Sequence, residues 1–126
     1  MSAAPRWVRL LHGDGTPLPL RARRCDTFLC RLRGLTFRRS LPPDEGLLFV
    51  EPVASRMGTS IHMAFVFFDI GVVWLADDGV VVDAQLAKPF RPYYAPRAAA
   101  RYYLEATPEL LTWVKIGERL TIEPTV

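Results

Sequence analysis

The hydrophobic side chains of this sequence are concentrated in one run, residues 61–76, which only His62, Asp69 and Gly71 interrupt. β-branched and aromatic residues make up much of the run, and such residues favour a strand over a helix. The run is also shorter and more polar than a membrane span, which needs about 20 apolar residues. We therefore expect buried β structure here, with residues 60–67 as an extended segment ahead of a strand.

The end of this run has the pattern of a β-hairpin. Asp78-Gly79 separates it from Val80-Val81-Val82, and this dipeptide is typical of a tight turn whose two central residues have positive φ. We expect paired strands at residues 69–76 and 80–86. Because the first strand is apolar on both faces, it should lie inside the sheet rather than at an edge.

The remaining patterns predict shorter elements around this hairpin. They are a hairpin over residues 7–11 and 18–23, strands at 47–50, 100–106 and 119–123, and a helix over 107–113. A further short helix is capped by Asp26 or Thr27 and ended by Gly34, with Phe28, Leu29 and Leu32 on one face. The sequence thus predicts one mainly β domain, residues 1–126, of compact sandwich or barrel type with two short helices.

The composition predicts the cellular compartment of the protein and the redox state of its cysteines. The N-terminal residues lack the apolar core of a signal peptide, so we expect a cytoplasmic protein. The two cysteines, Cys25 and Cys30, are five residues apart, which fits no common zinc-binding spacing. A bridge between them within one helix would be strained, so we expect two buried free thiols and neither a bound metal nor a cofactor.

The net charge of +3 is unevenly distributed along the chain. Residues 1–40 hold nine arginines and two aspartates, a balance of +7, whereas the rest of the chain holds seven bases and eleven acids, a balance of −4. Such a split can mark a nucleic-acid-binding surface. The aromatic residues are not interleaved with these arginines, however, so we favour arginines that lie on outer faces and pair with acids from the other half.

Five motifs in order give the sequence a resemblance to a known family. They are residues 31–35 (Arg-Leu-Arg-Gly-Leu), 41–49 (Leu-Pro-Pro-Asp-Glu-Gly-Leu-Leu-Phe), 60–62 (Ser-Ile-His), 100–105 (Ala-Arg-Tyr-Tyr-Leu-Glu) and 116–120 (Ile-Gly-Glu-Arg-Leu). Over residues 6–123 the chain resembles the domain of unknown function 192 (DUF192) family. The resemblance implies a compact, mainly β domain of bacteria and archaea with no established activity, and we expect a bacterial member.

The sequence departs from the family pattern at one acidic position. The family usually places an Asp in the strand after the Ser-Ile-His motif, and an ungapped alignment puts Gly71 there. Asp69 lies two residues earlier, on the same face of a strand, where it could supply a carboxylate. An activity that needs the family's Asp would therefore be lost or relocated in this chain.

Three polar residues, His62, Asp69 and Glu105, are set among apolar strand positions. If they converge, they could act as general acid and base, or bind a metal ion together with water. The alternative that we favour is structural. In it, His62 is buried and bonded to the backbone, Asp69 starts a strand, and Glu105 pairs with an arginine such as Arg33 or Arg101.

Two further groups are candidates for ligand binding. Arg33 and Glu45 could bind and orient an anion, although an Arg–Glu tether between two loops is the simpler interpretation. Phe90, Tyr93 and Tyr94 lie in a proline-rich loop, residues 88–96, and could form the aromatic wall of a ligand site or cover an open sheet edge.

These observations leave three functions open, of which we favour the first. The first is a small β domain that binds an unknown small molecule or a protein partner. The second is a hydrolase-like or metal-dependent enzyme that uses His62, Asp69 and Glu105. The third is a nucleic-acid-binding module that uses the N-terminal arginines. The favoured hypothesis predicts a monomer or weak homodimer that contacts neither membrane nor nucleic acid.

Overall fold

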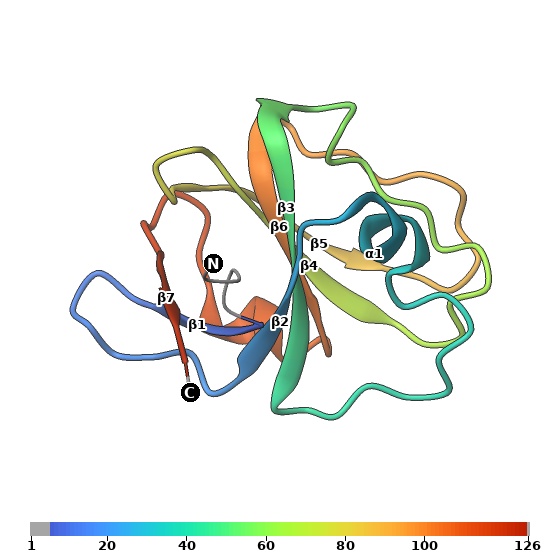
Figure 1. Cartoon of the computed structure of the whole chain (residues 1–126), viewed down its shortest axis with the longest axis horizontal. Helices are drawn as coiled ribbons and strands as arrows, with labels where there is room; N and C mark the ends of the chain where they lie inside the picture. Colours follow the sequence, from blue (N-terminus) through green and yellow to red (C-terminus); the bar gives the residue numbers. More distant parts are fainter. Residues whose placement is uncertain (1–5, 126) are drawn as a thin grey trace, which may run out of the picture.

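The computed structural model describes residues 6–125, apart from the side chain of Phe28, and over this range the chain forms seven strands and two short helices (Figure 1). The strands are β1 (Trp7–Leu11), β2 (Arg21–Cys25), β3 (Glu45–Ser55), β4 (Ile70–Leu75), β5 (Val81–Ala87), β6 (Ala100–Ala106) and β7 (Thr121–Pro124), and the helices are α1 (Phe28–Arg33) and α2 (Leu110–Trp113). This confirms the predicted mainly β class with two short helices.

The strands form one curled sheet in the order β5-β4-β6-β3-β2-β1-β7. The chain just ahead of β7 bonds to the start of β5, because the Val81 amide donates to the Glu118 carbonyl and the Gly117 amide to the Val81 carbonyl, both at 2.8 Å. These bonds close the sheet into a barrel. In Figure 1, β1 and β7 lie on one side of the central strands β3 and β6, and α1 lies on the other.

The β4–β5 hairpin has the predicted position, but its turn differs from the predicted one. Of Asp78 and Gly79 only Gly79 has positive φ, and its amide donates to the Ala76 carbonyl at 2.9 Å, so Asp77 and Asp78 are the central residues of the turn. Gly79 has φ of +88°, and a Cβ atom there would stand 2.3 Å from the Leu120 carbonyl oxygen, so the turn requires glycine. All six residues of β4 are buried, and the strand is paired with β5 on one side and β6 on the other. Its expected place inside the sheet is therefore confirmed.

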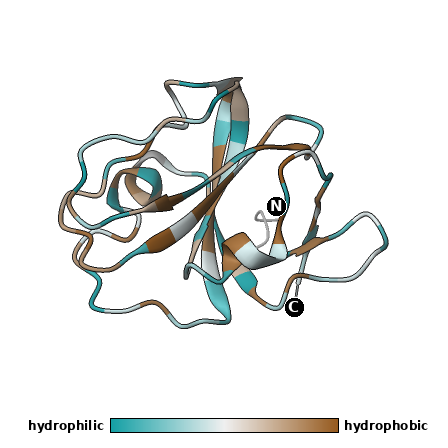
Figure 2. Cartoon of the chain, turned by 180° about the vertical axis from the view of Figure 1, so that it is seen from behind, coloured by the Kyte–Doolittle hydropathy of each residue, from teal (hydrophilic) through white to brown (hydrophobic). Residues whose placement is uncertain are grey.

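Strands β3, β4 and β6 contribute to two hydrophobic clusters, one on each face. Leu48 and Val50 of β3 belong to the inner cluster, inside the barrel, whereas Leu47 and Phe49 belong to the outer cluster on the opposite face. This alternation follows the two-residue period of a strand. In the hydropathy view, brown apolar segments lie along the strands that cross the centre diagonally, and the upright ribbon has teal segments among its apolar ones (Figure 2).

The connection between β2 and β3 crosses the outer face of the sheet. These two strands are parallel, unlike every other strand pair among the described residues, and parallel neighbours need a long crossover. The crossover, residues 26–44, contains α1. The Oγ1 atom of Thr27 accepts from the Cys30 amide at 3.2 Å, and Gly34 ends the helix with φ of +48°, as predicted.

Other boundaries differ from the expected ones. β3 is longer than the predicted strand 47–50, α2 is shorter than the predicted helix 107–113, and β7 begins two residues later than predicted. Leu29 and Leu32 of the expected helix face are exposed to solvent, and the side chain of Phe28 lies outside the described residues.

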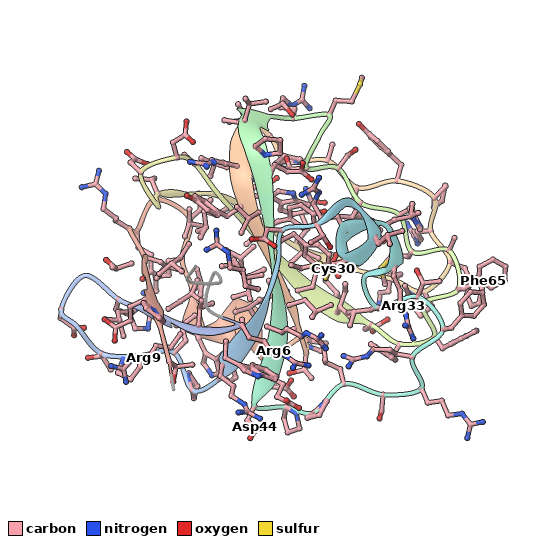
Figure 3. All side chains as sticks on the ribbon, in the orientation of Figure 1. Arg6, Arg9, Cys30, Arg33, Asp44 and Phe65 are labelled. Atoms are coloured by element: carbon pink, nitrogen blue, oxygen red, sulfur yellow. A yellow bond between two sulfur atoms is a disulfide. The ribbon has the colours of Figure 1, made fainter. Side chains whose placement is uncertain are left out.

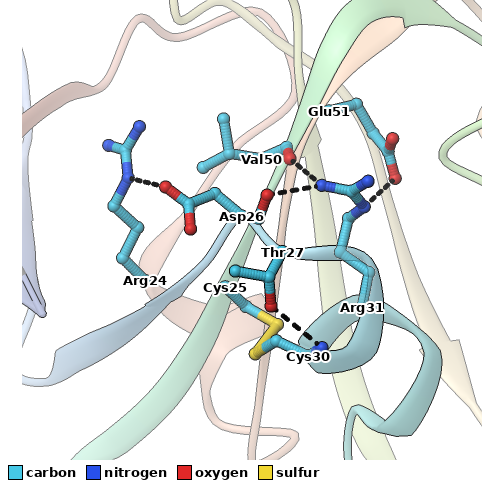
Figure 4. Close-up of a disulfide and its surroundings, with 8 residues drawn as sticks. All are labelled: Arg24, Cys25, Asp26, Thr27, Cys30, Arg31, Val50 and Glu51. Carbon is cyan, nitrogen blue, oxygen red and sulfur yellow. Dashed lines mark hydrogen bonds and ion pairs between the residues drawn. A yellow bond between two sulfur atoms is a disulfide. The ribbon is translucent and has the colours of Figure 1, made fainter. Parts of the chain in front are cut away.

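Cys25 and Cys30 form a disulfide, so the prediction of two free thiols was wrong (Figure 4). Cys25 is the last residue of β2, and Cys30 lies in α1 after the chain has turned through Asp26 and Thr27. The bridge therefore joins a strand to a helix, with 5.5 Å between the Cα atoms, rather than two positions of one helix. The disulfide and the Thr27 cap together attach α1 to the sheet.

We predict that Cys30→Ser lowers the free energy of unfolding by about 2 kcal/mol, because a short cross-linked loop restricts the unfolded chain. Urea unfolding of the variant, and of the native chain with and without dithiothreitol, measures the effect. The reduced native chain should unfold at the midpoint of the variant, and the variant should be insensitive to the reductant. Equal midpoints for oxidised and reduced native chain would contradict the prediction.

Candidate functional site

A cavity of about 60 Å³ lies between the outer face of the sheet and the segments that cover it. Phe49, Tyr103 and Glu105 form its floor, residues 33–36 form one wall, and residues 60–63 form another. The Phe49 and Tyr103 rings stack with their centroids 4.5 Å apart, since these residues face each other across the β3–β6 pair. The floor is therefore a rigid part of the sheet.

Two interactions hold the walls in place. The buried Trp74 indole of β4 donates to the Thr59 carbonyl at 2.7 Å, which fixes the chain immediately before residues 60–63. One Arg31 guanidinium nitrogen donates to the carbonyls of Asp26 and Val50, and the Glu51 carboxylate lies 3.3 Å from the Arg31 Nε (Figure 4). Arg31 thereby clamps α1 to β3.

Glu105 is a buried residue whose carboxyl forms no hydrogen bond or ion pair within residues 6–125, and its oxygen atoms keep some contact with solvent. It lies in β6 between Leu47 of β3 and Val72 of β4, and only 6% of its surface is exposed. Burial raises its pKa to about 8, because the ionised form loses its hydration. At neutral pH this side chain therefore carries a proton and can donate a hydrogen bond into the cavity.

Tyr103 presents a second proton donor beside Glu105. Burial is the largest cause that raises the pKa of the Tyr103 phenol, and the nearby carboxylates of Glu105 and Glu51 raise it further. The Arg31 guanidinium lowers this pKa by a smaller amount. The phenol thus keeps its proton at any physiological pH.

Three predicted site residues, Arg33, His62 and Glu105, line this one cavity. His62 is exposed rather than buried as expected, and its Nδ1 accepts from the Ala64 amide at 3.3 Å. Arg33 is the exposed last residue of α1 and does not form the expected pair with Glu105. Arg101, the other expected partner of Glu105, instead donates to the Glu51 carbonyl at 3.1 Å.

Asp69 and Glu45 lie elsewhere. The Asp69 carboxylate pairs with the Lys88 Nζ at 3.2 Å and is not part of the cavity lining. Glu45 pairs with Arg21 at 3.5 Å, so the expected Arg33–Glu45 tether is not formed in the described part of the chain. The His-Asp-Glu cluster considered from the sequence is therefore not assembled around the cavity.

The three aromatic residues of the proline-rich loop have different surroundings. Tyr94 is half-buried, pairs through its backbone with Ile61, and its hydroxyl accepts from the Lys88 amide at 2.8 Å. Tyr93 is largely exposed, whereas Phe90 joins other phenylalanines. Tyr94 thus braces the wall of the cavity, and the three rings do not form a common wall.

The fold also brings together an exposed phenylalanine cluster that the sequence did not reveal. Phe37, Phe65, Phe67 and Phe90 are each more than half exposed, and the Phe37 and Phe65 rings stack at 4.9 Å. Phe37, Phe65 and Phe90 have φ between 57° and 65°, a conformation that costs free energy for a bulky residue. Phe65 projects from the α1 side of the molecule (Figure 3).

Residues 6–125 contain no group of three or more His, Cys, Asp or Glu side chains placed to hold a metal ion. Nor does any helix in that range have the length and apolar character needed to cross a membrane.

Comparison with known proteins identifies the family. The model of the DUF192 family, described as "Uncharacterized ACR", matches residues 10–122. The chain belongs to the DUF192 family. Four of the five motifs that give it this resemblance, residues 31–35, 41–49, 60–62 and 100–105, supply residues to the cavity.

Curated relatives of this DUF192 member are archaeal UPF0127 proteins. UPF0127 protein TK1120 of Thermococcus kodakarensis is 38% identical over 79% of this chain and 63% of its own length. The relative from Thermococcus gammatolerans is 38% identical over 74% of this chain and 59% of its own length, so the chain spans less than two thirds of both. UPF0127 protein PF1050 of Pyrococcus furiosus is 33% identical, with coverages of 84% and 90%.

Two crystal structures share the fold. A protein from Sinorhizobium meliloti 1021, named as a proposed transcription regulator, has a TM-score of 0.79 and 25% identity, with 96% of this chain and 95% of that chain covered. A protein of unknown function from Novosphingobium aromaticivorans has a TM-score of 0.77 and 19% identity, with coverages of 95% and 94%. These relatives support no specific activity, and they do not support the expected bacterial source, because the curated ones are archaeal.

The raised pKa of Glu105 predicts a pH dependence of stability. In the unfolded chain this carboxyl ionises near 4.5, whereas in the folded chain it holds its proton up to about 8. The native chain therefore loses stability as pH rises from 4.5 to 8, and Glu105→Gln removes this loss. We expect the stability of the variant relative to the native chain to grow by several kcal/mol, at most about 5, across that window.

Urea unfolding at intervals between pH 4.5 and 9 measures this difference. Glu109→Gln is the matched control, because Glu109 is exposed and its pKa is lowered, so its loss should not change the slope above pH 4.5. Parallel pH profiles for Glu105→Gln and the native chain would refute the assignment.

Proposed function

We propose that this chain is a small-molecule-binding domain and that the cavity above Glu105 is its site. The observation that carries the proposal is the buried Glu105 carboxyl, which has no partner among the described residues and faces the cavity. Its oxygen atoms keep some contact with solvent, which can satisfy them in the free protein. A ligand that enters the cavity displaces this solvent and must supply the hydrogen bond in its place.

The size of the cavity limits what can enter. About 60 Å³ accommodates a few water molecules or a single small functional group, well below the roughly 300 Å³ of a pocket that encloses a whole drug-sized ligand. One end of the ligand would therefore enter the cavity, and the rest would extend past the rim formed by Arg33 and His62. Because Glu105 and Tyr103 are both proton donors, that end should carry a hydrogen-bond acceptor.

The alternatives receive less support. A hydrolase or metal-dependent enzyme using His62, Asp69 and Glu105 would need the Asp69 carboxylate at the cavity, and Asp69 pairs instead with Lys88. A nucleic-acid-binding role for the N-terminal arginines is weakened because four of the nine are paired with acids, three of them from beyond residue 40. A cytoplasmic location, a bacterial source and a monomer or weak homodimer stay predictions.

Titration of ¹⁵N-labelled protein with acetamide and with acetate tests the proposal, because both are small acceptors. We expect shifts in the amide resonances of Gly34, His62 and Tyr103. Glu105→Leu should weaken the interaction at least tenfold, as expected for the loss of a buried hydrogen bond, and Glu105→Gln should weaken it less because its amide still donates.

Glu109→Gln serves as the control for a general change in charge, since Glu109 is exposed on another part of the chain. Equal affinities of the native chain and Glu105→Leu, or shifts confined to other regions, would show that the cavity is not the site.

A further inference from the structure

A larger hollow of about 380 Å³ adjoins the cavity and shares Arg33 and Gly34 with it. Arg23 of β2 and Arg38 of the crossover also line it, together with apolar residues and the disulfide. We name this hollow the arginine groove. Three arginine residues thus line one concave surface, although they are up to 15 positions apart in the sequence.

The charge of the arginine groove is uncompensated. No acidic side chain lines it, and within residues 6–125 none of Arg23, Arg33 and Arg38 forms an ion pair. Other arginines of the same half are neutralised, and these pairs are Arg9 with Glu123, Arg21 with Glu45, Arg24 with Asp26, and Arg31 with Glu51. Like charges gathered in a hollow repel one another, so an anion bound among them would be strongly favoured.

One acid, Glu45, lies near the arginine groove. Glu45 lines a neighbouring hollow that also contains Arg23 and Arg38. Its carboxylate, however, is the partner of Arg21, and the groove itself does not include it. The groove therefore keeps its positive charge.

The backbone positions of the three arginines are fixed before any ligand binds. Arg23 lies in β2, where it is paired with Trp7 of β1 and Leu47 of β3. Arg33 ends α1, which the disulfide attaches to the sheet. The Arg38 amide donates to the Leu35 carbonyl at 3.1 Å, within a turn held in place by the bond from the Phe37 amide to the Phe65 carbonyl. Because the backbone is already in place, binding an anion would order only the arginine side chains.

We propose that the arginine groove binds a small anion with two or more negative charges, of phosphate or carboxylate type, through Arg23, Arg33 and Arg38. Guanidinium groups match such oxyanions because they donate two parallel hydrogen bonds to a pair of oxygens. The proposal extends the proposed function, since the groove and the cavity share Arg33, so that one molecule can place its anionic part in the groove and an acceptor above Glu105. The groove can be tested separately from the cavity, because Arg23 and Arg38 line the groove alone.

Calorimetric titration of the full chain with pyrophosphate and with citrate, at low and at physiological salt, tests the groove. We expect one molecule of at least one probe to bind per chain, and the two probes distinguish a phosphate-type from a carboxylate-type site. Arg23→Gln and Arg38→Gln should each weaken binding at least tenfold. Arg39→Gln is the matched control, because Arg39 is the next residue, is also exposed and does not line the groove. This substitution should weaken binding by less than threefold.

Four results would overturn the proposal. The first three are no binding of either probe, several anions bound per chain, and equal effects of Arg38→Gln and Arg39→Gln on anion affinity. The fourth is tight binding of a single-stranded oligonucleotide whose affinity both substitutions lower equally. Glu105→Leu separates the groove from the cavity. Unchanged pyrophosphate or citrate affinity in that variant supports a site in the groove, even if acetamide and acetate fail to bind above Glu105. Loss of anion binding in that variant would place the anion in the cavity and refute the groove.

Discussion

Strands β3, β4 and β6 lie side by side in the sheet and bury side chains on both faces, and this constraint determines much of the architecture. The barrel closes around one face, so the other face must be covered by segments that are not strands. The β2–β3 crossover, residues 60–68 and the proline-rich loop provide that cover. Trp74 shows how closely cover and sheet are joined, because its ring is buried against the outer face and its indole nitrogen holds the chain at Thr59. The cavity lies where this cover meets the floor formed by Phe49, Tyr103 and Glu105.

Features set by neighbouring residues could be predicted from the sequence. The hairpin at Gly79, the Thr27 cap and the stop at Gly34 each depend on a few consecutive positions, and all three are present. The type of the hairpin turn was wrong, because Asp78 does not have the positive φ that was expected of it. The disulfide could not be predicted in the same way, because the boundary between β2 and α1 falls between Cys25 and Cys30. Treating both cysteines as part of one helix made the bridge seem strained, whereas a turn between them brings the sulfur atoms together.

The candidate site was predictable only as a set of unusual residues. Glu105 is conspicuous as an acid in an apolar strand, but its lack of a partner depends on where Arg33 and Arg101 point in the fold. The same limit applies to the N-terminal arginines, whose number is plain in the sequence while their division into paired and unpaired groups is not. That division depends on contacts with acids such as Glu123, which is more than a hundred residues from Arg9. The phenylalanine cluster, assembled from three separate loops, left no local pattern to recognise.

The parallel pairing of β2 and β3 has a consequence for how members of this fold can diverge. The crossover that it requires supplies Arg31, Arg33 and Arg38, yet it contributes none of the inner cluster of the barrel. Its two ends are anchored by strand register, and between them Leu35 and Cys30 pack in the outer cluster. Changes at the exposed Arg33 and Arg38 would therefore alter the chemistry presented by this connection while the closed sheet and its inner cluster stay as they are. Ligand preference and the barrel are in this sense carried by different parts of the chain.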